Sequence, residues 1–310
     1  MNVVFFGMSG QFSRIPLDAL IQAGYTVSLI VTPALSRRAG PPVARIPPPT
    51  VASPSTRRSL PLLEPIAPGG LMGIAASHAI PVIEASGLSS PELLDTVAAN
   101  APEVMVAACF PWRLPAPLLA LPRLGCLNLH PSLLPDNRGP DPLFWAFRRG
   151  DDRTGVTVHL MDAGYDSGAI VAQREIAIVD GVTLTALERE CAEVGGRLLV
   201  EAVADLATGG SLPMPQDESR ATAYPAPRAE DFLISPQWTA RHCENFTRGL
   251  IGSGRQILLR LANDLFQVIE PLGYDENTSD LAVPYQLRGD TVSLRCASGV
   301  WRARVTQMTD

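Results

Sequence analysis

Residues 125–139 read GCLNLHPSLLPDNRG, an apolar run that ends in an Asn-x-His pair and continues into a loop flanked by two prolines. Pro131 and Pro135 each fix a backbone φ angle, which stiffens this loop. In an open α/β sheet, the side chains at the carboxyl ends of parallel strands face the crevice where ligands bind. The run therefore predicts a parallel α/β sheet whose ligand-binding crevice contains Asn128 and His130.

A second loop of interest follows the strand-like run Gly155–Leu160 and reads MDAGYDSG from Met161 to Gly168. Its acidic residues lie between glycines, which permit the tight turns that hold a loop close to a site. An amide, an imidazole and a carboxylate could therefore converge in the folded chain.

Length and composition predict a packed globular protein. The chain has 310 residues, of which 46% are hydrophobic and 18% charged, enough for one large or two ordinary domains. No apolar run reaches the roughly 18 to 20 residues that span a bilayer. The first residues, MNVVFFG, carry no charged region before their apolar segment. They are typical of a first core strand, and we expect a cytoplasmic protein.

Residue types exclude several classes of site. All 25 basic residues are arginine, so a Schiff-base lysine and a Gly-Lys-Ser/Thr phosphate loop are impossible. The five cysteines are widely spaced without Cys-x-x-Cys, which favours buried, reduced thiols over disulfides or zinc. His78, His159 and His242 lack partners at metal-ligand spacing, so we expect no metal. The absence of Gly-x-Ser-x-Gly argues against a serine hydrolase of the α/β type.

The first half of the chain alternates between strand and helix patterns. Its opening β-α-β pattern lacks both Gly-x-Gly-x-x-Gly and an acidic residue after the second strand, which disfavours a dinucleotide cofactor. The expected strands are Val3–Phe6, Thr26–Val31, Ile80–Ile83, Val104–Ala108 and Cys126–Leu129, with helices through Leu17–Ile21, Pro91–Ala99 and Ala116–Leu121. This alternation predicts a parallel sheet.

Residues 34–70 interrupt the alternation. They contain nine prolines and five arginines (Arg37, Arg38, Arg45, Arg57 and Arg58) against the single acid Glu64. Such a composition favours extended conformations and supplies no core. This insertion is either a poorly ordered loop or, as the family resemblance described below implies, a basic arm for a phosphorylated acceptor.

The second half of the chain predicts a long helix, a linker and a small domain. Leu184–Leu206 has the apolar spacing of an amphipathic helix that closes a first domain over residues 1–210. The proline-rich residues 211–228 are typical of a linker. Residues 229–310 predict a β-rich domain with a helix over Thr239–Leu250 and short strands over Gln256–Leu261, Leu265–Ile269, Thr291–Cys296 and Val300–Val305.

The motifs together resemble the folate-dependent formyltransferases, and their order is most similar to the methionyl-tRNA formyltransferase branch. Several short matches in one order are more specific than a single one. The matching segments are Asn128–Pro135, Arg138-Gly139, Pro142 with Trp145-Ala146, Thr154–Thr157 and Asp166–Gly168. The resemblance implies a Rossmann-like formyltransferase domain, a C-terminal domain of open-barrel, oligonucleotide-binding (OB) type, and 10-formyltetrahydrofolate as formyl donor, with no metal.

Formyl transfer gives each of three residues a distinct role. Asn128 offers an amide donor to the developing oxyanion. His130, with a pKa expected near neutrality, can hydrogen-bond the oxyanion or move a proton. Asp166 can orient the imidazole, and the resemblance favours it over Asp162 because the family places its carboxylate before Ser/Thr-Gly. A lone His130 would be more typical of a satisfied strand-end histidine, but Asn128 two residues earlier favours catalysis.

The resemblance also implies a folate site. Residues 109–115 occupy the place where relatives hold the pterin ring, although the usual Tyr-Gly is absent. We expect folate contacts from Phe110, Trp112, Arg113, Leu114, Ser132, Leu133, Pro135, Asp162 and Gly164, with core packing as the alternative for Phe110 and Trp112. Arg138 binds an acidic end of the folate or fixes its own loop. Asp141 touches an acceptor amine or is a solvated loop residue.

The acceptor is left open by the sequence. The layout and the basic residues 37–58 favour initiator methionyl-tRNA. Residues 229–310, however, contain eight arginines and ten acids, which is not the charge expected of an RNA-binding surface. A small amine such as an amino sugar is therefore a competing acceptor. A formyltetrahydrofolate hydrolase, which uses water instead of an amine, and a non-enzymatic binder are the alternative functions.

Overall fold

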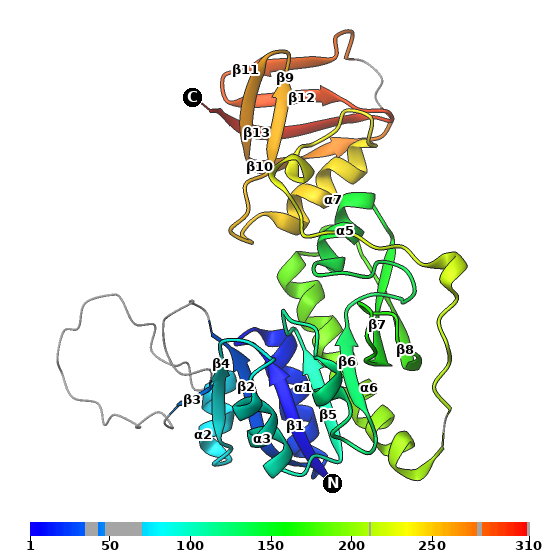
Figure 1. The fold of residues 1–310 in the computed structure, drawn as a ribbon. Coiled ribbons are helices and arrows are strands. Elements are labelled where there is room, and N and C mark those ends of the chain that lie inside the picture. Colours follow the sequence, from blue (N-terminus) through cyan, green and yellow to red (C-terminus); the bar gives the residue numbers. More distant parts are fainter. Residues whose placement is uncertain (35–42, 47–69, 211, 278–280, 309–310) are drawn as a thin grey trace, which may run out of the picture. The chain divides into compact units, whose positions relative to one another are not determined.

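The computed structural model describes residues 1–34, 43–46, 70–210, 212–277 and 281–308 (Figure 1). The density of contacts divides the chain into two compact units. Unit 1 comprises residues 1–138, 155–175 and 189–222, and unit 2 comprises residues 139–154, 176–188 and 223–310. The predicted boundary at 211–228 stays a prediction.

An eight-stranded sheet, in the order β3-β4-β2-β1-β5-β6-β7-β8, organises the first part of the chain. Its strands are β1 (Asn2–Gly7), β2 (Thr26–Pro33), β3 (Val43–Ile46), β4 (Val82–Ala85), β5 (Val104–Ala108), β6 (Cys126–His130), β7 (Arg153–Leu160) and β8 (Ile170–Ala177). The five strands from β4 to β6 are parallel, as predicted. At the edges, β3 is antiparallel to β4 and β7 is antiparallel to β6, two pairings that the sequence did not predict.

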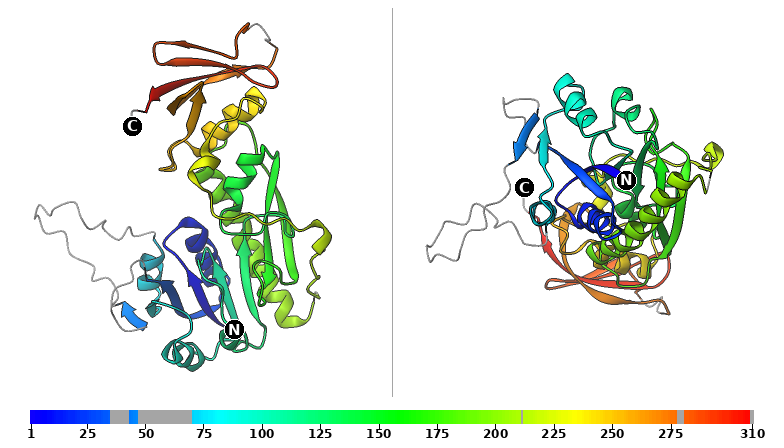
Figure 2. Two further views of the ribbon diagram at one scale, coloured as in Figure 1. Left: turned by 45° about the horizontal axis from the view of Figure 1, so that its top comes forward. Right: turned by 90° about the horizontal axis from the view of Figure 1, so that it is seen from below.

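Helices cover both faces of this sheet. α1 (Gln11–Gln22) and α6 (Leu184–Thr208) lie on one face, and α3 (Pro91–Ala99) lies on the other (Figure 2). α6 approaches closely through Gly195 and Gly196. A Cβ on Gly195 would lie 2.9 Å from the side chain of Leu129 in β6, and one on Gly196 would lie 3.1 Å from Cβ of Ala19 in α1. The two glycines weaken the helix by about 1 kcal/mol each, and this close packing compensates for it.

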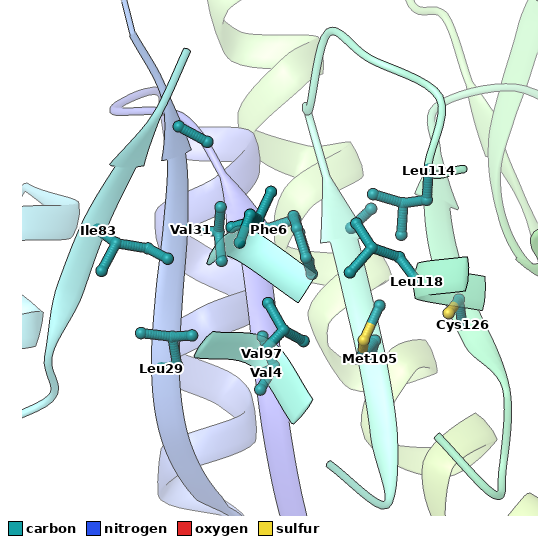
Figure 3. Packing of buried hydrophobic residues seen from close by; sticks show 13 residues of the cluster. Val4, Phe6, Leu29, Val31, Ile83, Val97, Met105, Leu114, Leu118 and Cys126 are labelled. Atoms are coloured by element: carbon teal, nitrogen blue, oxygen red, sulfur yellow. The ribbon is translucent and has the colours of Figure 1, made fainter. Parts of the chain in front are cut away.

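The core follows from the apolar central strands. Every residue of β5 is buried, as are Val3, Val4, Phe5 and Phe6 of β1, which is typical of parallel strands covered on both faces. Figure 3 shows one side of this core, where Val4, Phe6 and Met105 meet Val97 of α3 and Leu118 of α4 (Ala116–Leu119). α3 and β5 have the predicted bounds. Ser90 begins α3 by accepting a hydrogen bond from the amide of Leu93.

Most of the Pro/Arg-rich insertion lies outside the described residues. Of its arginines only Arg45 is described, and its side chain is exposed. Val43–Ile46 form the edge strand β3, which pairs with β4 and was not predicted. The sequence also missed α2 (Leu71–Ser77) just after the insertion.

Unit 2 contains a curled antiparallel sheet in the order β11-β12-β13-β10-β9. Its strands are β9 (Leu258–Leu261), β10 (Asp264–Asp275), β11 (Tyr285–Arg288), β12 (Thr291–Arg295) and β13 (Val300–Gln307). α7 (Ala240–Leu250) packs against it (Figure 1), and α5 (Pro142–Arg149) also belongs to this unit. Fully buried Trp301 donates from Nε1 to Oε2 of buried Glu244 at 3.0 Å. The expected β-rich C-terminal part is confirmed.

The cysteines follow the sequence expectation with one exception. Cys126, Cys191, Cys243 and Cys296 are buried, whereas Cys109, just after β5, is exposed. Burial raises the pKa of Cys126 to about 12, so this thiol stays protonated. Among the described helices, none combines the length and apolarity needed to cross a membrane.

The core assignment predicts a difference between two identical substitutions. Leu29 of β2 is 2% exposed, whereas Leu212 is 94% exposed. Leu29→Ala should lower the free energy of unfolding by about 2 to 5 kcal/mol because it leaves a cavity. Leu212→Ala should change it by less than about 0.5 kcal/mol. Urea denaturation followed by circular dichroism measures both, and equal losses would contradict this core.

Candidate active site

β6 presents Asn128 and His130 on one face, because alternate residues of a strand point the same way. Nε2 of His130 lies 3.1 Å from the carbonyl oxygen of Asn137. A carbonyl oxygen can only accept, so Nε2 carries the hydrogen, and Nδ1 is the ring atom left for chemistry. Asn137 has a φ of +64°, in the stiff loop after β6. The loop after β6 thus fixes the tautomer of His130 through the carbonyl of Asn137.

The loop after β7 brings Asp166 to these two side chains. Its Oδ1 lies 3.3 Å from Nδ2 of Asn128 and 3.7 Å from Nδ1 of His130. The structure therefore brings Asn128, His130 and Asp166 together, as the sequence suggested. Asp166 has a φ of +51°, in the left-handed region that costs an L-residue roughly 1 kcal/mol or more. Surrounding contacts must hold this conformation.

His159 belongs to the same cluster and was missed by sequence reasoning. The register of β6 and β7 pairs Asn128 with His159, and Nδ2 of Asn128 lies 3.1 Å from Nε2 of His159. Nδ1 of His159 lies 2.8 Å from the carbonyl oxygen of Leu160, so Nδ1 carries the hydrogen and Nε2 accepts from Asn128. The Asn128 amide thus donates one hydrogen to His159 and the other to Asp166.

A sequence signal for His159 existed but was weak. His159 alternates with Thr157 along β7, and Thr157 pairs with His130 in the observed register. A search restricted to metal-ligand spacing could not detect this pairing, because it spans two strands. Within the described residues, no group of three or more His, Cys, Asp or Glu side chains could hold a metal ion.

The geometry of the Asp166 loop depends on its small residues. A Cβ on Gly168 would overlap the backbone oxygen of Leu160. Oδ1 of Asp162 accepts hydrogen bonds from the amide of Gly164 and the hydroxyl of Ser167, both at 2.8 Å. Asp162 and Gly164 therefore shape the loop. A folate contact from either residue stays a prediction.

The expected folate residues after β5 pack partly into the core. Phe110 contacts Phe6 edge to face, with ring centroids 5.3 Å apart, and Trp112 contacts Phe110 in the same way at 5.7 Å. Leu114 is 2% exposed and belongs to the core in Figure 3. Arg113 donates to the carbonyl oxygen of Ala163. The β5–α4 connection is thereby joined to the Asp166 loop.

The expected folate residues after β6 hold their own loop. The Ser132 hydroxyl donates to the carbonyl oxygen of Asp136 at 2.8 Å, and its own carbonyl oxygen accepts from the hydroxyl of Thr157 at 2.7 Å. The Leu133 side chain packs so close to Gly155 that a Cβ there would collide with it. Pro135 lies in the same turn. These contacts anchor the loop to β7.

Arg138 and Asp141, for which the sequence left two alternative roles each, both bind other side chains of the protein. Arg138 donates to Gln216 and forms an ion pair with Glu218 at 2.7 Å, which supports its loop-fixing role. Asp141 pairs with Arg255 at 2.5 Å and is only 20% exposed. Asp141 is therefore not the freely solvated loop residue that was one of its two alternatives.

Burial dominates the electrostatics of His130, whose side chain is 6% exposed. Desolvation lowers the pKa of His130, while the Asp166 carboxylate and the Asn137 carbonyl raise it and His159 lowers it further. The net result is a pKa below the ordinary histidine value. At neutral pH the ring is uncharged and its Nδ1 can accept a proton.

Residues 1–203 match the family described as Formyl transferase. This chain belongs to the formyl transferase family. It is 31% identical over 307 residues to the methionyl-tRNA formyltransferase of Synechococcus sp. (strain JA-2-3B'a(2-13)), a match that covers 98% of this chain and 87% of the relative. The expected family and enzyme class, a formyltransferase, are confirmed, and the hydrolase alternative is not favoured.

Solved formyl transferase-like structures share the fold. An N-formyltransferase from Helicobacter canadensis, solved with folinic acid and dTDP-3-aminofucose, superposes with a TM-score of 0.63 at 12% identity and 99% coverage of both chains. HypX from Aquifex aeolicus in complex with tetrahydrofolic acid gives a TM-score of 0.58 at 16% identity. The match covers 99% of this chain and 44% of HypX, so this chain spans less than half of that protein.

The electrostatic arrangement can be tested without any substrate. We expect the His130 ring to titrate below the ordinary histidine pKa of about 6.5. Asp166→Asn should lower this pKa further, because it removes the negative charge that favours the imidazolium. Proton NMR of the four histidines, with the His130 signal assigned by its loss in His130→Ala, measures the titration.

Asp162→Asn is the matched control for this titration. It removes a carboxylate from the same loop while an amide oxygen can still accept from Gly164 and Ser167. An equal or higher His130 pKa in Asp166→Asn would contradict the arrangement.

Proposed function

We propose that this enzyme transfers the formyl group of 10-formyltetrahydrofolate to a primary amine, with Asn128, His130 and Asp166 carrying the reaction. The observation that carries the proposal is the convergence of these three side chains at 3.3 to 3.7 Å in a chain of the formyl transferase family. The solved relatives with tetrahydrofolic acid and with folinic acid support a folate donor.

The reaction needs a proton acceptor and an oxyanion donor. The amine nitrogen attacks the formyl carbon, and the carbonyl electrons move to oxygen to give a tetrahedral oxyanion. Collapse of this intermediate breaks the bond between the formyl carbon and the folate nitrogen. One proton leaves the amine, and one reaches the departing nitrogen. A single group that accepts the first proton and returns it to the second nitrogen balances the transfer.

His130 suits this proton transfer. Its Nδ1 holds a lone pair because Nε2 donates to Asn137. Its lowered pKa keeps the ring neutral and ready to accept a proton at neutral pH. After protonation, Nδ1–H faces the Asp166 carboxylate at 3.7 Å, which stabilises the imidazolium until the proton moves on.

Asn128 is suited to bind the oxyanion, although both of its amide hydrogens already have protein acceptors, which the sequence did not suggest. One amide hydrogen is directed to His159 at 3.1 Å, which fixes the side chain. The other is directed to Asp166 over a longer distance of 3.3 Å, and this hydrogen can be shared with a developing oxyanion. Loss of such a donor typically costs about 3 kcal/mol in transition-state stabilisation.

The folate contacts remain part of the proposal. The rings of Phe110 and Trp112 offer apolar surface beside the core, and Arg113 links them to the Asp166 loop. Leu114 is buried, so we assign it backbone contacts alone. The other proposed contacts are Ser132, Leu133, Pro135, Asp162 and Gly164.

We propose initiator methionyl-tRNA as the acceptor. The 31% identity to a methionyl-tRNA formyltransferase extends over 98% of this chain, including the curled C-terminal sheet. An amino-sugar nucleotide is the second candidate, because residues 229–310 have more acids than arginines. The basic residues 37–58 bear on this choice, but all except Arg45 lie outside the described residues. We place the reaction in the cytoplasm, where charged tRNA is made.

Release of tetrahydrofolate from 10-formyltetrahydrofolate tests both the reaction and its acceptor. We expect release with charged initiator methionyl-tRNA, and none with amino sugars, amino acids or buffer alone. His130→Ala should lower kcat/KM by about 10²- to 10⁴-fold because it removes the proton carrier. Asn128→Ala should lower it by roughly 10²- to 10³-fold.

His78→Ala is the matched control, since it makes the same substitution at an exposed histidine and should leave the rate unchanged. Release with an amino sugar alone would reassign the acceptor. Release without any acceptor would indicate a hydrolase. No release under any of these conditions would overturn the proposal.

A further inference from the structure

Gln216 lies between α6 and the short 3-10 helix η1 (Glu218–Arg220), and its carboxamide uses its full hydrogen-bonding capacity. Nε2 donates to the carbonyl oxygen of Asp166 at 2.7 Å and to that of Gly168 at 2.8 Å. Oε1 accepts from Nη2 of Arg138 at 2.7 Å and from Nε at 3.2 Å. An amide has two donor hydrogens and two acceptor lone pairs, and each has a protein partner here.

The two carbonyls held by Gln216 belong to a turn that needs support. Asp166 adopts a positive φ, and such a conformation persists only where neighbouring groups hold it. Gly168, two residues later, packs against the backbone of Leu160 too closely for any side chain. Gln216 therefore hydrogen-bonds to both ends of the three-residue turn 166–168. The backbone of this turn sets the direction of the Asp166 side chain.

The segment that carries Gln216 is itself anchored to the site. Main-chain hydrogen bonds of 2.8 Å in both directions join Met214 to Ile170 of β8. The Thr222 hydroxyl accepts from the amide of Asn137 at 2.8 Å, and the Thr222 carbonyl oxygen accepts from the amide of Arg138 at 2.9 Å. Asn137 in turn fixes the tautomer of His130. Residues 214–222 thus support the loops of both His130 and Asp166.

We propose that Gln216 is a positioning residue that sets the distance between the Asp166 carboxylate and Nδ1 of His130. Its two donated hydrogen bonds hold the turn that aims the carboxylate, and its bonds from Arg138 hold the amide in place. The inference rests on the proposed function for its effect on rate. Its effect on the ionisation of His130 is independent of any substrate.

The test compares Gln216→Met with wild type. Methionine has a similar length and no donor, so the turn loses both hydrogen bonds. We expect kcat/KM for formyl transfer to fall on the order of 10²-fold, the cost of a misplaced catalytic group, with KM nearly unchanged. We also expect the His130 pKa, measured by NMR, to fall in the same direction as in Asp166→Asn. The acid limb of the pH profile of kcat/KM should then shift to lower pH.

Glu218→Gln is the matched control. Glu218 lies two residues away, is 68% exposed and binds the same Arg138, but no described contact joins it to the Asp166 turn. We expect this variant to keep the His130 titration and to change kcat/KM by less than about two-fold, because an exposed ion pair contributes little to holding Arg138 in place. Gln216→Asn, which keeps the amide on a shorter side chain, serves if Gln216→Met does not fold.

Two results would overturn the inference. One is an unchanged His130 titration in folded Gln216→Met, or in folded Gln216→Asn, whatever the rate. The other is a loss of kcat/KM in Glu218→Gln equal to that in Gln216→Met. Such a loss would assign the effect to the anchoring of residues 214–222 by Arg138 and not to Gln216 itself. Absence of formyl transfer in wild type would overturn the proposed function instead, and the NMR comparison would still decide the role of Gln216.

Discussion

The register between β6 and the antiparallel strand β7 is the constraint on which the site depends. It places His159 opposite Asn128 and Thr157 opposite His130. A shift by one residue would turn the His159 side chain to the opposite face of the sheet. Asn128 would then lose the His159 acceptor that fixes its amide. The loop after β7 would also start one residue earlier or later, which would move Asp166 away from Asn128 and His130. The hydrogen bonds of the cluster are therefore consequences of strand pairing.

Burial and charge act on His130 in opposite directions, and burial prevails. The ring lies almost fully within the protein, and desolvation lowers its pKa more than Asp166 and the Asn137 carbonyl raise it. The two raising groups contact different ring atoms, Nδ1 and Nε2. The carbonyl fixes which nitrogen carries the proton in the neutral ring, and the carboxylate stabilises the second proton when it arrives. A neutral ring poised beside a carboxylate is the state that proton acceptance from an amine requires.

The sequence predicted features that local patterns determine. Apolar runs placed α3, β5 and most of β6 correctly, and the Asn-x-His pair and Asp166 proved to be neighbours. It did not predict the direction of β7, because an apolar run carries no information about which way a strand pairs. For the same reason His159 was dismissed. The sequence also did not predict the lowered pKa of His130, because this pKa depends on how deeply the folded chain buries the ring.

The segment predicted as a linker shows the same limit more clearly. The proline-rich residues 211–228 are typical of a linker, and residues 212–217 contain no helix or regular strand. Composition, however, does not show what extended backbone binds. Met214 pairs with β8, Gln216 holds the Asp166 turn and Thr222 holds the loop after β6. A formyltransferase chain cut at residue 210 would keep all three proposed catalytic side chains and lose the residues that hold two of them in place.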